Sequence, residues 1–125
     1  MTKKKLRAMS PAETEILRLV WQFSEATVQQ ICDRLPPDRK VTYNTVQTLL
    51  SRLEQKGYLK HRAEGRAHVF FPVVKRQDVV RSTVVDFLDR LFGGDPRPLV
   101  QFLAEDGRID ETDIERLKKL IPKNK

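Results

Sequence analysis

The sequence of 125 residues contains one cysteine, Cys32, two histidines and no long apolar run. A single cysteine excludes a disulfide framework and any metal site built from several cysteines, and it favours the reducing cytoplasm as the location. No apolar stretch approaches the roughly 20 residues of a membrane-spanning helix, and none follows the basic first residues as in a signal peptide. The chain also lacks a glycine-rich phosphate loop and a nucleophile elbow. We therefore expect neither an enzyme nor a cofactor, a metal site or a membrane segment.

Positive charge is present, but it is unevenly distributed. Residues 1–76 hold 15 Lys and Arg against 7 Asp and Glu, a net charge of +8, whereas residues 77–125 hold 9 against 10, a net charge of −1. A basic N-terminal part joined to a neutral part indicates a module that binds a polyanion, followed by a part with another role.

The N-terminal residues combine a basic arm with a helix start. Residues 1–9 form the arm, which would serve either as a solubility tail or as a contact to DNA phosphates or the minor groove. Ser10 and Glu13 have the spacing of a capping box, and Pro11 suits the first helical position. These signals predict a helix over residues 11–23.

A second capping signal predicts a short second helix. Thr27 and Gln30 have the same spacing as the first pair, and Pro36-Pro37 ends the helix because proline lacks a backbone donor. Cys32 falls on the apolar stripe of this helix, so we expect a buried core thiol and not a redox sensor.

A third helix is predicted from Thr42 to Lys56, with Gly57 as its natural end. At about 100° per residue, its polar positions lie opposite the apolar stripe. This polar face carries almost no charge, and amides and hydroxyls are the groups that read base edges in a major groove. A merely solvated face is the alternative for an isolated helix. The candidate base-reading residues are Asn44, Gln47, Thr48 and Ser51.

Two predicted strands, Leu59–Ala63 and Ala67–Phe71, follow the third helix and are joined by Glu64-Gly65-Arg66. Three helices followed by a basic hairpin are the element order of a winged helix-turn-helix. We expect His61 and His68 to lie on the strand surface without a zinc site. The candidate phosphate-contacting residues of the third helix and the hairpin are Thr42, Tyr43, Thr45, Arg52, Lys60, Arg62 and Arg66.

The remaining residues predict three more helices, over 76–92, from Pro98 to about Glu105, and after Asp110. In the helix over 76–92, the apolar residues Val80, Val84, Phe87 and Leu91 are spaced by 4, 3 and 4 positions and form a seam that is typical of a helix packed against another helix. These helices are too few to enclose a core, so we expect them to pack on a second copy. The chain would then divide into a DNA-binding domain over 1–75 and a helical dimerisation domain over 76–125. The expected dimer contacts are Val80, Val84, Phe87, Leu88, Leu91, Leu99, Phe102, Leu103, Ile114 and Leu117.

Several of these motifs together resemble the penicillinase repressor family, which includes BlaI and MecI. The motifs, in chain order, are Ser10-Pro11-Ala12-Glu13, the run from Thr45 to Leu53 with Lys56-Gly57, Gly65-Arg66 with Phe70-Phe71-Pro72, and the run from Phe87 to Gly94. The resemblance implies a homodimeric winged-helix repressor that occupies a palindromic operator of double-stranded DNA before β-lactamase or other stress genes.

The same resemblance implies a possible protein partner and a candidate cleavage segment. Family members that respond to β-lactams are inactivated by a regulatory protease at an Asn-Phe bond in the dimerisation domain. The corresponding residues here are Gln101 and Phe102, so the asparagine is absent. Copper-responsive relatives carry a C-terminal cysteine cluster, which this chain does not have. An adaptor that uses the winged-helix fold to bind protein, without reading DNA, is the alternative function.

Overall fold

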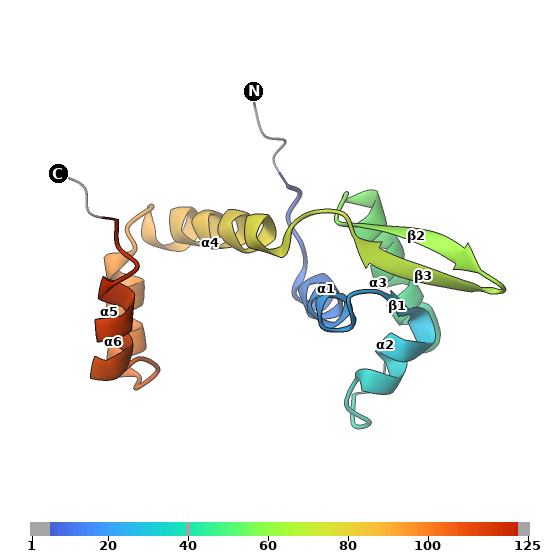
Figure 1. Cartoon of the computed structure of the whole chain (residues 1–125), viewed down its shortest axis with the longest axis horizontal. Helices are drawn as coiled ribbons and strands as arrows, with labels where there is room; N and C mark the ends of the chain where they lie inside the picture. The colour runs from blue at the N-terminus through green and yellow to red at the C-terminus, as the bar shows by residue number, and fades with distance from the viewer. Residues whose placement is uncertain (1–5, 40, 123–125) are drawn as a thin grey trace. The chain divides into compact units, whose positions relative to one another are not determined.

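The computed structural model describes residues 6–39 and 41–122 (Figure 1). The chain divides into two compact units, and the division falls inside a helix, between Thr83 and Val84. Mainly helical structure with a small antiparallel sheet confirms the predicted fold class. The elements follow in the order α1 (Pro11–Phe23), β1 (Ala26–Thr27), α2 (Val28–Arg34), α3 (Tyr43–Gln55), β2 (Leu59–Glu64), β3 (Ala67–Pro72), α4 (Arg76–Phe92), α5 (Arg97–Glu105) and α6 (Glu111–Lys118).

Both predicted capping boxes are present at the starts of α1 and α2. The Glu13 N–H donates to Ser10 Oγ at 3.1 Å, and the Ser10 N–H donates back to Glu13 Oε1 at 2.9 Å. Thr27 and Gln30 form the same reciprocal pair at 3.1 and 2.8 Å. Each box satisfies two backbone donors that the first helical turn leaves unpaired, which is why these helices begin where the sequence predicts.

The sheet has three strands in the order β1-β3-β2, and both pairings are antiparallel. Strands β2 and β3 form the predicted hairpin, and β1 lies on the other side of β3. The sequence did not predict β1, because a strand of two residues is too short to show an alternating pattern. This strand attaches the hairpin to the segment between α1 and α2.

The hairpin connection is shorter than the sequence suggested. Glu64 belongs to β2 and pairs with Ala67, so only Gly65 and Arg66 form the turn. Gly65 has φ +61°, a left-handed conformation that glycine adopts at little cost. Glu64 therefore lies on a strand, two residues from Arg62.

The first unit has one hydrophobic core between its three helices and the sheet. Its largest fully buried side chains are Ile16, Leu17, Val20, Ile31, Val46, Leu50, Leu53 and Leu59. The expectation for Cys32 was wrong in degree, because its side chain packs against this core but is only half-buried. The apolar stripe of the helix correctly predicted that the Cys32 side chain points toward the core. It could not predict how much of that side chain the neighbouring elements bury.

Cys32 should nevertheless react slowly in the folded protein. Burial, together with the neighbouring Asp33 carboxylate, raises the pKa of the Cys32 thiol and so lowers the fraction of reactive thiolate. We expect labelling by a disulfide reagent at neutral pH to be several-fold slower than that of free cysteine, with unchanged DNA binding after modification. Labelling at the rate of free cysteine, or loss of DNA binding on mild oxidation, would instead indicate a redox sensor.

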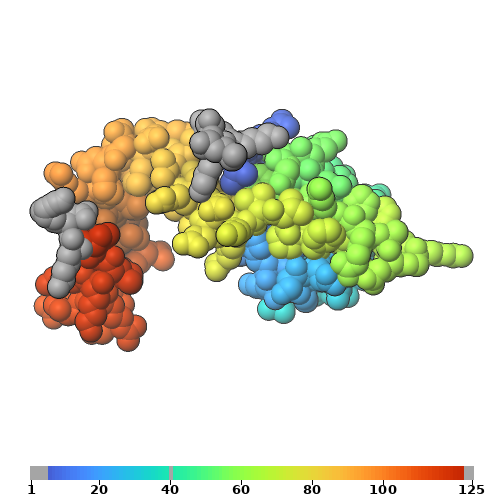
Figure 2. All heavy atoms as spheres, turned by 45° about the horizontal axis from the view of Figure 1, so that its top comes forward, coloured from blue at the N-terminus to red at the C-terminus, as the bar shows by residue number. Residues whose placement is uncertain are grey.

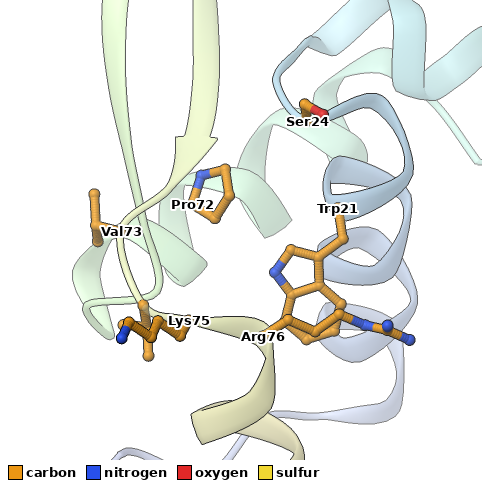
Figure 3. A pocket seen from close by; sticks show the side chains of 7 residues that line it. Trp21, Ser24, Pro72, Val73, Lys75 and Arg76 are labelled. Atoms are coloured by element: carbon orange, nitrogen blue, oxygen red, sulfur yellow. The ribbon is translucent and has the colours of Figure 1, made fainter.

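The first turns of α4 belong to the first unit. Val79 is 3% exposed and is part of the core, and the Arg76 guanidinium lies 5.5 Å from the centre of the Trp21 ring. Figure 3 shows Trp21 and Arg76 facing each other beside a hollow that Pro72, Val73 and Ser24 also line. The structural division therefore lies within α4, whereas the sequence places the domain boundary before residue 76.

The second unit is helical and exposes its apolar side chains. Asp110 caps α6 by accepting from the Asp113 N–H at 2.9 Å, and Asp113 accepts from the Asp110 N–H at 3.0 Å. None of the described residues of α5 or α6 is buried. Since none of the described residues from Val84 to Pro122 is buried, the second unit lacks a core of its own, and burial of apolar surface is the main term that holds a fold together.

Candidate nucleic-acid interface

Helix α3 presents the predicted polar face to solvent. Thr42 caps the helix by accepting from the Thr45 N–H at 3.1 Å, and Val46, Leu49, Leu50 and Leu53 anchor the opposite face in the core. All four candidate base-reading residues are exposed: Asn44, Gln47, Thr48 and Ser51. Their spacing of 3, 4 and 7 residues places them on one side of the helix. The structure thus provides an exposed row of amides and hydroxyls on a rigid element.

The residues predicted to contact phosphate around α3 differ in their environments. Tyr43 is 50% exposed in the first turn, and Arg52 is exposed in the last turn without an ion pair to another described residue. The hydroxyls of Thr42 and Thr45 lie 3.0 Å apart and are engaged in the cap. Tyr43 and Arg52 are therefore available to a ligand, whereas the two threonines also hold the helix start.

The β2–β3 hairpin projects from the body of the first unit, as Figure 2 shows in yellow-green. Lys60 and Arg66 are exposed on it and form no ion pair with other described residues. Arg62 differs, since its guanidinium pairs with both Glu25 and Glu64 at 2.7 Å. These two carboxylates raise the pKa of Arg62. The β2–β3 hairpin is the wing of the predicted winged helix. Of its three basic residues that were predicted to contact phosphate, Lys60 and Arg66 form no ion pair with another described residue, whereas Arg62 is paired with two carboxylates.

The wing also carries a histidine pair that packs beside α3. His61 and His68 stack with ring centroids 4.5 Å apart, and His61 Nδ1 lies 2.6 Å from Glu54 Oε1. Both histidines are exposed, as expected for strand surface residues. In the described part of the chain no group of three or more metal-binding side chains lies together. The contact between His61 and Glu54 joins β2 to the last turns of α3.

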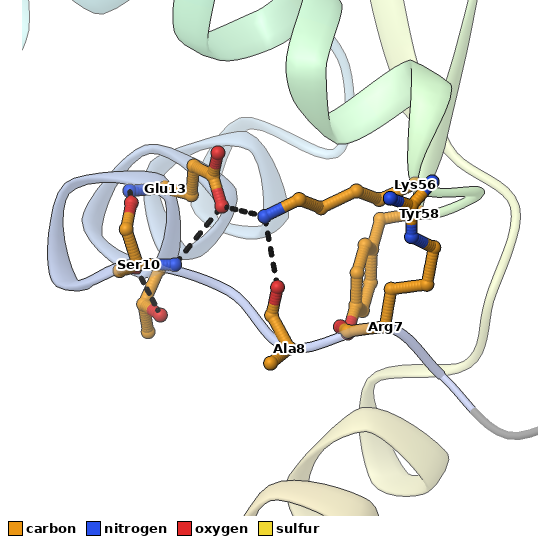
Figure 4. Close-up of polar contacts among 7 residues, drawn as sticks. Arg7, Ala8, Ser10, Glu13, Lys56 and Tyr58 are labelled. Atoms are coloured by element: carbon orange, nitrogen blue, oxygen red, sulfur yellow. Dashed lines mark hydrogen bonds and ion pairs between the residues drawn. The ribbon is translucent and has the colours of Figure 1, made fainter.

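A partly buried ion pair, which the sequence did not predict, joins α1 to the end of α3. Glu13 is 2% exposed, and Lys56 Nζ lies 2.6 Å from its Oε1 (Figure 4). Burial raises the pKa of Glu13, but the hydrogen bonds from Lys56 and from the Ser10 N–H outweigh this effect, so the pKa is lowered overall. The carboxylate is therefore charged in the folded protein at neutral pH and depends on its lysine partner.

The same lysine helps to hold the end of the N-terminal arm. Lys56 Nζ donates to the Ala8 carbonyl at 2.8 Å, and the Tyr58 hydroxyl donates to the Arg7 carbonyl. Leu6 and Met9 pack against the core. Residues 6–9 are thus attached to the first unit, while the lysines of the predicted arm, residues 3–5, lie outside the described residues.

The expected dimer residues are exposed or half-buried in the single chain. Val80, Val84, Phe87, Leu91, Phe102 and Leu117 are between 43% and 64% exposed. Leu88, Leu99, Leu103 and Ile114 are half-buried. Leu120 and Ile121, two apolar residues that follow α6, are 75% and 66% exposed. The apolar side chains of this helical region are therefore fully or partly exposed to solvent in a single chain.

The order of three helices and a wing, with an uncharged polar face on α3 and free cations on the hairpin, defines a winged-helix DNA-binding protein. Two solved structures support this class. The chain is similar to the DNA-binding domain of the repressor BlaI, with 33% identity and a TM-score of 0.53 over 61% of this chain and 93% of that one. It is also similar, with 33% identity and a TM-score of 0.51, to the monomeric form of Bacillus licheniformis BlaI in complex with the blaP half-operator.

Residues 9–123 match the family described as penicillinase repressor, and the chain belongs to that family. The penicillinase repressor of Bacillus licheniformis is 28% identical over 98% of this chain and 95% of its own length. The Staphylococcus aureus penicillinase repressor is 25% identical over 90% of each chain. The family consists of transcriptional repressors, so the expectation of a DNA-binding regulator without enzymatic activity is confirmed.

Within the described residues, no helix is both long and apolar enough to cross a membrane.

Proposed function

We propose that this chain acts as a homodimer in the cytoplasm and represses transcription by occupying a palindromic operator. Helix α3 would lie in the major groove, and the β2–β3 hairpin would lie along the neighbouring backbone or minor groove. The observation that carries this proposal is the exposed uncharged face of α3 together with Lys60 and Arg66 of the hairpin, which are exposed and form no ion pair with another described residue. Base edges are read by amides and hydroxyls, while phosphates are contacted by cations, and this surface presents both kinds of group.

The second unit supports the dimeric form of this proposal. Helices α5 and α6 have no buried residue, and on α4 the seam from Val80 to Leu91 leaves side chains such as Phe87 and Leu91 exposed. Exposed apolar surface of this extent is typical of a protein-protein interface. A second copy of the chain would cover this surface with an identical surface of its own. The resulting dimer has two-fold symmetry, which matches the symmetry of a palindromic operator.

The regulated genes that we propose are β-lactamase or other stress genes, and a regulatory protease is the proposed partner that ends repression. The segment corresponding to the family's cleavage site lies on α5, where Phe102 is 52% exposed and Gln101 is also exposed. Gln101 Nε2 donates to Glu105 Oε2 at 3.1 Å within the helix. A protease would therefore have to unwind α5 to cleave there, because proteases bind extended backbone.

Base reading and phosphate binding should separate by mutation. Replacing Asn44 or Gln47 by Ala should cost roughly 1–3 kcal/mol of operator binding and relax the sequence preference at one position. Replacing Arg66 by Ala should weaken binding to operator and scrambled duplexes about equally, and should reduce the slope of log affinity against log salt by about one. Fluorescence anisotropy of each variant on both duplexes over a salt series measures all of these effects.

Two results would contradict these assignments. Equal weakening of both duplexes by Asn44→Ala, together with operator-only weakening by Arg66→Ala, would reverse the two roles. Binding by the unaltered chain that does not change with salt would instead favour the adaptor function, because release of counterions from DNA makes its complexes strongly salt-dependent.

A further inference from the structure

The wing arginine Arg62 lies on the face of the sheet away from the core. In the sheet register, Arg62 of β2 and Thr27 of β1 both lie opposite Val69 of β3, so their side chains share one face. Phe70, the next residue of β3, belongs to the core and therefore points to the other face. Val69 is 6% exposed although it is not part of that core. On this outer face, Arg62 is the direct cross-strand neighbour of Val69.

The contacts of Arg62 cross the sheet. Its Nη1 and Nη2 donate to the two carboxylate oxygens of Glu25 at 2.9 and 2.7 Å, a bidentate arrangement. Its Nε and Nη2 donate to one oxygen of Glu64 at 2.9 and 2.7 Å. Glu25 directly precedes β1, so the first contact extends from the outer strand β2 past β3 to the segment that follows α1. The contact with Glu64 stays within β2.

We propose that Arg62 is a positioning residue, which fixes the wing to the helical part of the first unit through Glu25 and does not contact DNA phosphate. This inference rests on the proposed role of the wing in DNA binding. With His61 contacting Glu54 of α3 on the inner face, the hairpin is fastened on both faces of the sheet. Arg66 at the turn and Lys60 on β2 remain free for phosphate. A fixed wing reduces the conformational freedom that is lost on binding, which favours affinity.

The chain provides a matched pair of variants for this proposal. Glu25→Gln and Glu64→Gln each remove one negative charge beside the same guanidinium, so their direct electrostatic effects on DNA are similar. Of these two glutamates, only Glu25 joins the hairpin to another part of the first unit, the segment between α1 and β1. Arg62→Met removes the charge of the arginine but keeps an apolar stem over Val69. The side chains of Arg62, Glu25 and Glu64 are 43%, 48% and 57% exposed, so little change in global stability is expected from any of the three.

The first measurement is amide hydrogen exchange of β2 and β3 in the free full-length protein. Glu25→Gln and Arg62→Met should increase exchange there several-fold, and Glu64→Gln should leave it nearly unchanged. The second measurement is binding to operator DNA over a salt series. Glu25→Gln should weaken binding roughly 2- to 10-fold relative to Glu64→Gln, and Arg62→Met should weaken it without changing the salt slope.

Three results would overturn the proposal. These are equal tightening of DNA binding by both glutamate variants, a salt slope that falls by about one in Arg62→Met, and unchanged exchange in Glu25→Gln. The first two would make Arg62 a phosphate contact for which the glutamates compete. The exchange experiment needs no DNA, so failure of the proposed DNA-binding role, seen as a wild-type chain without salt-dependent binding, is distinguishable from failure of the positioning role.

Discussion

Phe87→Asp and Leu91→Asp variants should sediment as monomers at micromolar concentration, where the unaltered chain should sediment as a dimer. The two side chains are 45% and 64% exposed in the single chain and lie on the same seam of α4. If they meet a second copy, each substitution places a charge in an apolar interface, where an unpaired ion costs several kcal/mol. Loss of the dimer should also lower operator affinity on the order of 100-fold or more, because a monomer cannot bind both half-sites of the operator at once.

Val85→Asp is the matched control for these variants. Val85 is 50% exposed on the same helix, but it lies about 120° around the helix from the centre of the seam. This variant should remain a dimer and keep its operator affinity. If Phe87→Asp and Leu91→Asp also remain dimers, the seam is not the interface and the assignment of the second unit to dimerisation is wrong.

Lys56→Met should strongly destabilise the first unit. It leaves the Glu13 carboxylate, 2% exposed, without the cation that lies 2.6 Å away. Breaking such a pair from one side typically costs 3–5 kcal/mol when both partners are buried, and because Lys56 is 22% exposed we expect about 2–4 kcal/mol. Urea unfolding at pH 7 measures the loss. Lys60→Met, the same change at an exposed lysine without an ion pair to a described residue, should change stability by less than about 0.5 kcal/mol.

The pH dependence of stability provides a second test of this pair. The pKa of Glu13 is lower in the folded protein than its ordinary value of 4.5, so the unfolded chain binds more protons in the range between the two values. The stabilisation by Glu13 is therefore present above pH 4.5 and is lost as the pH falls through the lowered pKa. Glu13→Gln should remove this part of the acid dependence. An unchanged profile in this variant would show that the pair does not contribute to stability.

The sequence was informative where local signals decide the structure. The capping boxes at Ser10 and Thr27 set two helix starts, and the apolar stripe of α3 predicted which of its residues reach the solvent. Gly65 correctly marked the hairpin turn, because a tight turn requires a residue that tolerates positive φ. The winged-helix fold could therefore be predicted from element order before any contact was known.

Contacts between distant residues could not be predicted in the same way. Arg62 reaches Glu25 across 37 positions, and Lys56 reaches Glu13 across 43. No periodicity or spacing relates such pairs, since they depend on how the sheet and the helices pack together. For this reason the basic character of the hairpin led to the prediction that Arg62 contacts phosphate, and its pairing with two carboxylates could not be foreseen.

The most direct test of a dimeric repressor is selection of duplexes from a random DNA pool by the full-length protein at physiological salt, followed by sequencing. A dimeric repressor should enrich an inverted repeat, with half-site centres separated by about 10 base pairs or a multiple of that spacing. Repeating the selection with Asn44→Ala should relax one position in each half-site. Enrichment of no motif, or of a single half-site without its inverted copy, would contradict the account.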